Sequence, residues 1–150
     1  MPTATARSSL ATRSNLGFLL AKASQRWNEL LYEQFVARGY GEVRPAYGSI
    51  LLPLFEDDGL RMGELARRAR LSKQTMTTMV RLLERDGLVT RESDPDDGRA
   101  SLVHLTPRAR AFRPVANEVL GNLEARVAER LTKRQANALK SALTRGVIEL

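Results

Sequence analysis

The chain has 150 residues, enough for one domain with a buried core or for a small domain with an added oligomerisation element. Hydrophobic residues make up 43% of the sequence and charged residues 27%, as in soluble globular proteins, and no apolar run is long enough to span a bilayer. The net charge is +7, and arginine supplies most of the 24 basic residues. This charge suits a nucleic acid, an acidic membrane surface or an acidic protein as partner.

Two residue types that carry much of enzyme chemistry are scarce. There is no cysteine, which excludes disulfides, thiolate nucleophiles and zinc–thiolate sites and favours a reducing, cytoplasmic compartment. The single histidine, His104, lies between the apolar Val103 and Leu105 in a predicted strand, where we expect it to face solvent. We therefore predict that the protein is not an enzyme and uses no metal and no cofactor.

The first third of the chain is predicted to be helical after a short tail. Residues 1–14 are rich in Ser, Thr, Ala and Arg, and we expect a flexible basic tail there, although organellar targeting peptides start with a similar composition. Apolar residues recur at three- and four-residue steps over 15–38, which predicts an amphipathic helix. A second helix is predicted over 45–55, tightened near Pro53, and a turn over 57–59.

Two short helices follow, predicted over 62–69 and 73–85. Ser72 is expected to cap the second of them, because its hydroxyl can accept a hydrogen bond from a free backbone N–H. Gly87 can end that helix with a positive φ. Four apolar side chains of the second helix are expected to be buried: Met76, Met79, Val80 and Leu83.

The pattern then changes from the period of a helix to that of strands. Residues 88–92 and 100–105 are predicted strands, joined by a long polar tip over 93–99 into a β-hairpin. A long helix is predicted to start at Thr106-Pro107, where threonine caps and proline occupies the first turn.

The last helix is predicted to start at Thr132, which together with Gln135 resembles a capping box, and to run to Leu150. Its apolar residues exceed what a single bundle of this size needs to bury. They are Leu139, Leu143, Val147 and Ile148. We therefore expect the terminal helices to pack against a second copy of the chain.

Positive charge is concentrated around the helix predicted over 73–85. Between residues 61 and 85 the sequence has seven basic residues and two acidic ones, a net charge of +5. A basic cluster around one helix is a more specific sign of nucleic-acid binding than a basic total.

The outward face of the same helix has the chemistry of base recognition. Glutamine can bond bidentately to adenine, and the threonine methyl can touch the thymine methyl. Threonine is a poorer helix former than the Glu, Lys and Ala of a merely solvated face, so its abundance favours a reading role. The predicted DNA-binding residues of this segment are Ser72, Lys73, Gln74, Thr75, Thr77, Thr78 and Arg81.

The hairpin adds one further predicted DNA contact. Arg99 follows an aspartate-rich turn, and an arginine on an exposed wing can enter a narrow, negatively charged minor groove. We expect Asp97 to support the wing, by bracing its tip or orienting Arg99. The alternative is a solvated surface hairpin with no partner.

Several motifs in this order resemble the MarR family of bacterial regulators. The resemblance rests on Leu65-Ala66 with the segment 71–89, and on Asp97-Gly98-Arg99 followed by Leu105-Thr106-Pro107. It extends over residues 15–150, with the specific motifs between 60 and 110. The sequence departs from the family pattern at Arg70 and Ala109, where glycine is common.

This resemblance implies a mainly α fold with a small β-hairpin wing, a winged helix-turn-helix with N- and C-terminal dimerisation helices. The DNA-binding domain would occupy 45–106, and the dimerisation region 15–44 and 107–150. It further implies a homodimer that acts as a repressor by binding double-stranded DNA at a pseudo-palindromic operator. A small aromatic or phenolic ligand would release this homodimer from the DNA.

Two alternatives remain open from the residues alone. Trp27, Tyr32 and Tyr47 can line a ligand pocket, but aromatic residues at helical spacing are more often plain core. The chain can also be a winged-helix module that binds protein and does not read DNA. The polar helix face and Arg99 favour DNA, since an apolar exposed face would be expected for protein docking.

Overall fold

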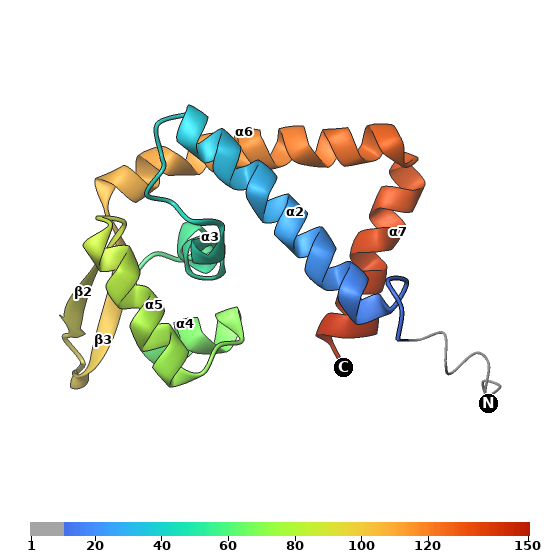
Figure 1. Cartoon of the computed structure of the whole chain (residues 1–150). Helices are drawn as coiled ribbons and strands as arrows, with labels where there is room; N and C mark the ends of the chain where they lie inside the picture. Colours follow the sequence, from blue (N-terminus) through green and yellow to red (C-terminus); the bar gives the residue numbers. More distant parts are fainter. Residues whose placement is uncertain (1–10) are drawn as a thin grey trace.

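The computed structural model describes residues 11–150, so most of the tail predicted over residues 1–14 lies outside the described residues. The elements in chain order are α2 (Leu16–Ala37), the 3-10 turn η1 (Pro45–Tyr47), α3 (Gly48–Glu56), β1 (Leu60–Arg61), α4 (Met62–Ala69), α5 (Lys73–Arg85), β2 (Val89–Asp94), β3 (Asp97–Leu105), α6 (Pro107–Arg130), α7 (Lys133–Leu143) and the π-helical turn η2 (Thr144–Ile148). Helices α3 to α5 and the sheet gather on one side, and α2, α6 and α7 are arranged as three sides of a triangle on the other (Figure 1).

Helices α2, α5, α6 and α7 begin where the sequence supplies a side-chain N-cap. The Ser72 hydroxyl accepts a hydrogen bond from the Thr75 N–H, and Thr106 accepts one from the Ala109 N–H. Thr132 and Gln135 form the predicted capping box. These three predictions are confirmed.

The core lies between α3, α4, α5 and the sheet, and it continues to α2 and α6. Val80 and Leu83 of α5 are fully buried against it, and Met76 is 1% exposed. Met79, also expected inside, is only half-buried. Helix α5 therefore has a narrow apolar stripe and a wide polar face.

The sheet has three antiparallel strands in the order β1-β3-β2, so the predicted hairpin is confirmed but a third strand was missed. Strand β1 has only two residues, paired as Leu60 with Val103 and Arg61 with Leu102, too short for alternation to be recognised. The predicted seven-residue tip is wrong, because the strands extend to Asp94 and from Asp97. Both carboxylates accept backbone hydrogen bonds at the turn, and these bonds let polar residues continue the hairpin.

Two helix predictions need correction. The segment 45–55 is a 3-10 turn followed by α3, and Pro53 lies inside α3. The last helix does not run to Leu150 as one α-helix, because α7 ends at Leu143 and a π-helical turn follows. No helix of the described chain is both long enough and apolar enough to cross a membrane.

Candidate nucleic-acid interface

The polar face of α5 is presented to solvent, as expected from the sequence. Ser72, Lys73, Gln74, Thr75, Thr78 and Arg81 are exposed, and Thr77 is half-buried. All of these residues except Arg81 lie at the N-cap or in the first turns of α5. Those are the turns that reach base edges when a helix lies in a major groove.

Two threonine hydroxyls of this face are already engaged as donors. Thr77 Oγ1 donates to the Lys73 carbonyl at 2.9 Å, and Thr78 Oγ1 donates to the Gln74 carbonyl at 3.1 Å. Each of these two hydroxyls has a single proton, so what they present outward is an acceptor oxygen and a methyl group. That combination matches an exocyclic amine of a base or a thymine methyl.

Much of the basic cluster counted from the sequence is neutralised by acids. Arg67 and Arg68 both bind Glu64, and Arg68 also binds Asp57. Hydrogen bonds from Arg67 and Arg68 lower the pKa of Glu64 to about 2.

Two further arginines of the cluster have partners just outside the window that was counted. Arg85 pairs with Asp86, and Arg61 pairs with Asp94. Within the described chain, Lys73 and Arg81 are the residues of the cluster whose side chains have no ion pair or hydrogen bond. The net charge of +5 therefore overstates the free positive charge near α5.

The remaining arginine of the cluster adopts an unusual backbone conformation. Arg70 follows α4 with φ 54° and ψ 41°, the left-handed region in which glycine is common. Its Nη1 donates to the Ile148 carbonyl at 2.7 Å, so the turn of the helix-turn-helix is tied to the C-terminal segment.

The wing carries Arg99 near its tip. The Asp97 carboxylate accepts the Arg99 backbone N–H at 3.0 Å, which is the geometry of a brace on the tip. The roles assigned to these two residues stay predictions. Arg99 has no ion pair or hydrogen bond from its guanidinium in the described part of the chain.

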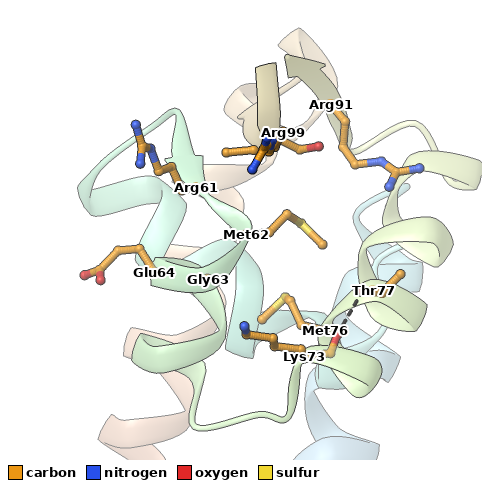
Figure 2. A pocket seen from close by; sticks show the side chains of 11 residues that line it. Arg61, Met62, Gly63, Glu64, Lys73, Met76, Thr77, Arg91 and Arg99 are labelled. Carbon is orange, nitrogen blue, oxygen red and sulfur yellow. Dashed lines mark hydrogen bonds between the residues drawn. The ribbon is translucent and has the colours of Figure 1, made fainter. Parts of the chain in front are cut away.

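A cavity of about 510 Å³ separates the start of α5 from the wing. Figure 2 shows Lys73 and Met76 on its α5 side and Arg99 and Arg91 from the strands across from them. Arg61 and Arg91 also line it, and sequence analysis did not select them as site residues. Arg91 is held by Glu84 of α5 at 2.7 Å, and spacing along the chain does not reveal such a pairing between elements.

The C-terminal end of α5 is anchored by a buried tyrosine. Tyr47 is 2% exposed, and its hydroxyl donates to the Asp86 carboxylate at 2.5 Å. The hydrogen bond from Tyr47 and then that from Arg85 lower the pKa of Asp86, while burial and then Asp86 raise the pKa of Tyr47. Tyr47 is thus a core residue that positions α5.

Further hollows are bounded by the terminal helices. One of about 260 Å³ lies between α2, α3 and α6, with Trp27, Phe35, Phe55 and Phe112 among its lining residues. Another is an apolar groove of about 890 Å³ between α2, α6 and α7. Of the three aromatic residues considered for a ligand pocket, Trp27 lines both hollows and the two tyrosines line neither. Tyr32 donates its hydroxyl to the Gly41 carbonyl, and Tyr47 is buried in the core.

The described residues contain no group of three His, Asp or Glu side chains that could hold a metal ion. His104 is partly exposed, and it lies 3.9 Å from Asp58 and 3.6 Å from Glu92.

The fold and this surface define a winged helix-turn-helix protein, and comparison with known proteins specifies the family. Residues 45–101 match the model of the MarR family. The HTH-type transcriptional repressor Rv2887 of Mycobacterium tuberculosis is 39% identical over 90 residues, which are 60% of this chain and 65% of that protein. The chain thus spans just under two thirds of that relative's length.

Solved structures resemble nearly the whole chain. A probable transcriptional regulator from Pseudomonas aeruginosa superposes with a TM-score of 0.77 at 28% identity, covering 89% of this chain and 98% of that one. The repressor CouR, solved on a 23-mer DNA duplex, gives a TM-score of 0.75 at 28% identity, covering 87% of this chain and 90% of CouR. Residues 45–101 are thus a domain that matches the MarR family, and the fold of nearly the whole chain is similar to that of solved transcriptional regulators.

Proposed function

We propose that the protein is a sequence-specific transcriptional regulator, a repressor, that binds double-stranded DNA through α5 and the wing. The observation that carries the proposal is the exposed polar face at the start of α5, with Arg99 of the wing across a cavity from it. A helix and a wing so placed can occupy a major groove and the neighbouring minor groove. The names of the relatives support the proposal, since Rv2887 and CouR are both called repressors.

The same proposal includes a homodimer on a pseudo-palindromic operator, with residues 45–106 as the DNA-binding domain and 15–44 and 107–150 as the dimerisation region. The apolar groove between α2, α6 and α7 supports it, because a monomer would leave the groove open to water. Leu139 in its wall is 47% exposed, and Leu16 and Leu19 on α2 are 61% and 50% exposed. A second copy would cover such a surface and supply the two-fold symmetry of a palindrome.

A small aromatic effector that releases the DNA is the third part of the proposal. The hollow between α2, α3 and α6 has four aromatic rings and one cation, Arg44, among its lining residues. A planar ligand with a phenol or carboxylate group suits that lining. The regulator PcaV from Streptomyces coelicolor, solved with its natural ligand, shows that a protein of this fold holds a ligand.

The competing function is a winged-helix module that docks on protein and does not read DNA. It is disfavoured because the exposed face of α5 is polar and carries Lys73 and Arg81 without acidic partners in the described chain. Protein-docking surfaces are depleted of lysine and have an apolar centre.

The direct test is selection of bound duplexes from a random pool and from fragments of the parent genome. We expect a shared two-fold symmetric sequence, and we expect Gln74→Ala to relax the preference at specific base pairs without loss of non-specific binding. Recovery of unrelated sequences, with a Gln74→Ala profile identical to that of the wild type, would contradict base reading by α5. The matched control is Arg134→Ala, at the start of α7 and outside the proposed DNA-binding domain.

A further inference from the structure

One buried acid of the wing has no place in the site described above. Among residues 11–150, Asp94 is the one charged residue in the buried class, with 5% of its surface exposed. Its carboxylate lies 2.6 Å from Nε of Arg61 and accepts the Asp96 backbone N–H at 2.9 Å. A buried carboxylate is retained at low cost only when it has such partners.

The ion pair joins parts of the sheet that are not neighbours. Asp94 ends β2 and Arg61 ends β1, and the middle strand β3 lies between these two strands. The register shifts between Ser93 and Asp94, and such irregularities re-aim side chains at the rim of a sheet. Arg61 is also the residue that precedes α4, so the pair connects the wing tip to the helix-turn-helix.

Apart from this pair, no side-chain ion pair or hydrogen bond joins residues 94–99 to the rest of the described chain, so the tip otherwise depends on the β2–β3 ladder. Arg99 lies only two residues beyond Asp97, the partner of Asp94 in that ladder. A tilt of the tip would therefore move Arg99 relative to α5. The two elements can reach adjacent grooves of one duplex only if their separation is held.

We propose that Asp94 and Arg61 are positioning residues. Their ion pair, called the clamp below, holds the wing so that Arg99 and α5 engage the same DNA. The inference rests on the proposed function. The inference deepens the proposed function, because it assigns an acidic residue of the wing a favourable effect on the binding of negatively charged DNA.

The direction in which one substitution changes DNA affinity tests the role of the ion pair. If Asp94 acted only through its charge, Asp94→Ala would strengthen binding, because an acid near phosphates is repulsive. The clamp instead predicts about tenfold weaker binding of a duplex selected by the wild type. Asp96→Ala is the matched control: it removes an exposed acid two residues away, and it should leave affinity unchanged or slightly raised.

A double-mutant cycle shows whether the effect passes through Arg99. In an Arg99→Ala background, Asp94→Ala should cost little further affinity, because the side chain that it positions is gone. An undiminished loss in that background, or binding by Asp94→Ala as tight as by Asp96→Ala, would overturn the proposal. Asp94→Asn keeps an acceptor for the Asp96 N–H and should lose less affinity, which preserves the test if the alanine variant does not fold.

Hydrogen exchange in the free protein separates this inference from DNA binding itself. Arg61→Ala should speed exchange of the Asp96 amide, although Arg61 does not contact that amide, because it releases the Asp94 carboxylate. If the wild type binds no duplex but this exchange effect is present, the proposed function fails and the clamp stands. If the wild type binds and exchange at Asp96 is unchanged, the clamp fails alone.

Discussion

At the scale of single residues, the proposed DNA reading rests on side chains that are exposed and unpaired. Arg81 lies on the exposed face of α5 and Arg99 near the wing tip, and neither has an acidic partner among the described residues. We predict that replacing either with alanine weakens duplex binding by about 1–3 kcal/mol, because a charge-assisted contact is lost. Titration of a labelled duplex measures this, with circular dichroism to confirm an unchanged fold. Unchanged affinity for both variants would refute their assigned roles.

Arg70 offers a second residue-level prediction, on stability. Its left-handed backbone is costly for any residue with a Cβ, by roughly 1–2 kcal/mol. Arg70→Ala and Arg70→Gly both lose the bond to the Ile148 carbonyl, but only glycine relieves the backbone. We expect the glycine variant to be more stable than the alanine variant by about 1 kcal/mol in urea unfolding. Equal stabilities would show that the turn is not strained.

Some contacts of single residues could be predicted from the sequence and others could not. The cap at Ser72 and the exposed face after it follow from local rules, because a cap and a helix face depend on residues three or four apart. The pairing of Arg61 with Asp94 does not, because 33 positions separate the two. Charge counting failed for a different reason: the window of residues 61–85 left out Asp57, which binds Arg68, and Asp86, which binds Arg85.

Among the elements, α5 depends on its tie to the turn before α3. Tyr47→Phe removes the hydroxyl that binds Asp86, and we predict a loss of about 1.5 kcal/mol of unfolding free energy at neutral pH. Tyr40→Phe is the control, because the Tyr40 hydroxyl has no hydrogen bond within residues 11–150. Chemical denaturation of both variants beside the wild type measures the difference, and equal losses would contradict the tie.

The same tie predicts a pH dependence. The pKa of Asp86 is lowered in the folded state, so its stabilising contribution is present above its ordinary pKa and is lost as pH falls through the lowered value. The difference between wild type and Tyr47→Phe should therefore be constant near neutrality and shrink below about pH 4. A difference that grows on acidification would reverse the sign and reject this account of Asp86.

The boundaries of an element could be predicted where a cap or a glycine sets them. The predicted boundaries were wrong where pairing with a distant part of the chain sets them. Helix α5 has its predicted bounds, whereas β1 was missed and the hairpin tip was drawn too long. Two residues of β1 form a strand only because Val103 and Leu102 of β3 lie beside them. The acids at the tip look like loop residues until their bonds to the turn backbone are seen.

For the whole molecule, the terminal helices carry the prediction of self-association. Leu139 lines the apolar groove and is half exposed, so Leu139→Glu should place a charge where the proposed second copy packs. We expect the wild type to sediment at twice its 16.7 kDa and the variant as a monomer. Val36→Glu, at an exposed apolar position outside the groove, should remain dimeric. If both variants remain dimeric, the groove is not part of the interface between the two copies.

Binding of a duplex by α5 and the wing is tested most directly by its salt dependence. Phosphate contacts release condensed counterions, so the logarithm of affinity should fall linearly and steeply with the logarithm of salt concentration. Replacing Lys73 with alanine should reduce that slope by about one if it contacts a phosphate. Duplex binding with a flat salt response, or no binding at low ionic strength, would contradict the account.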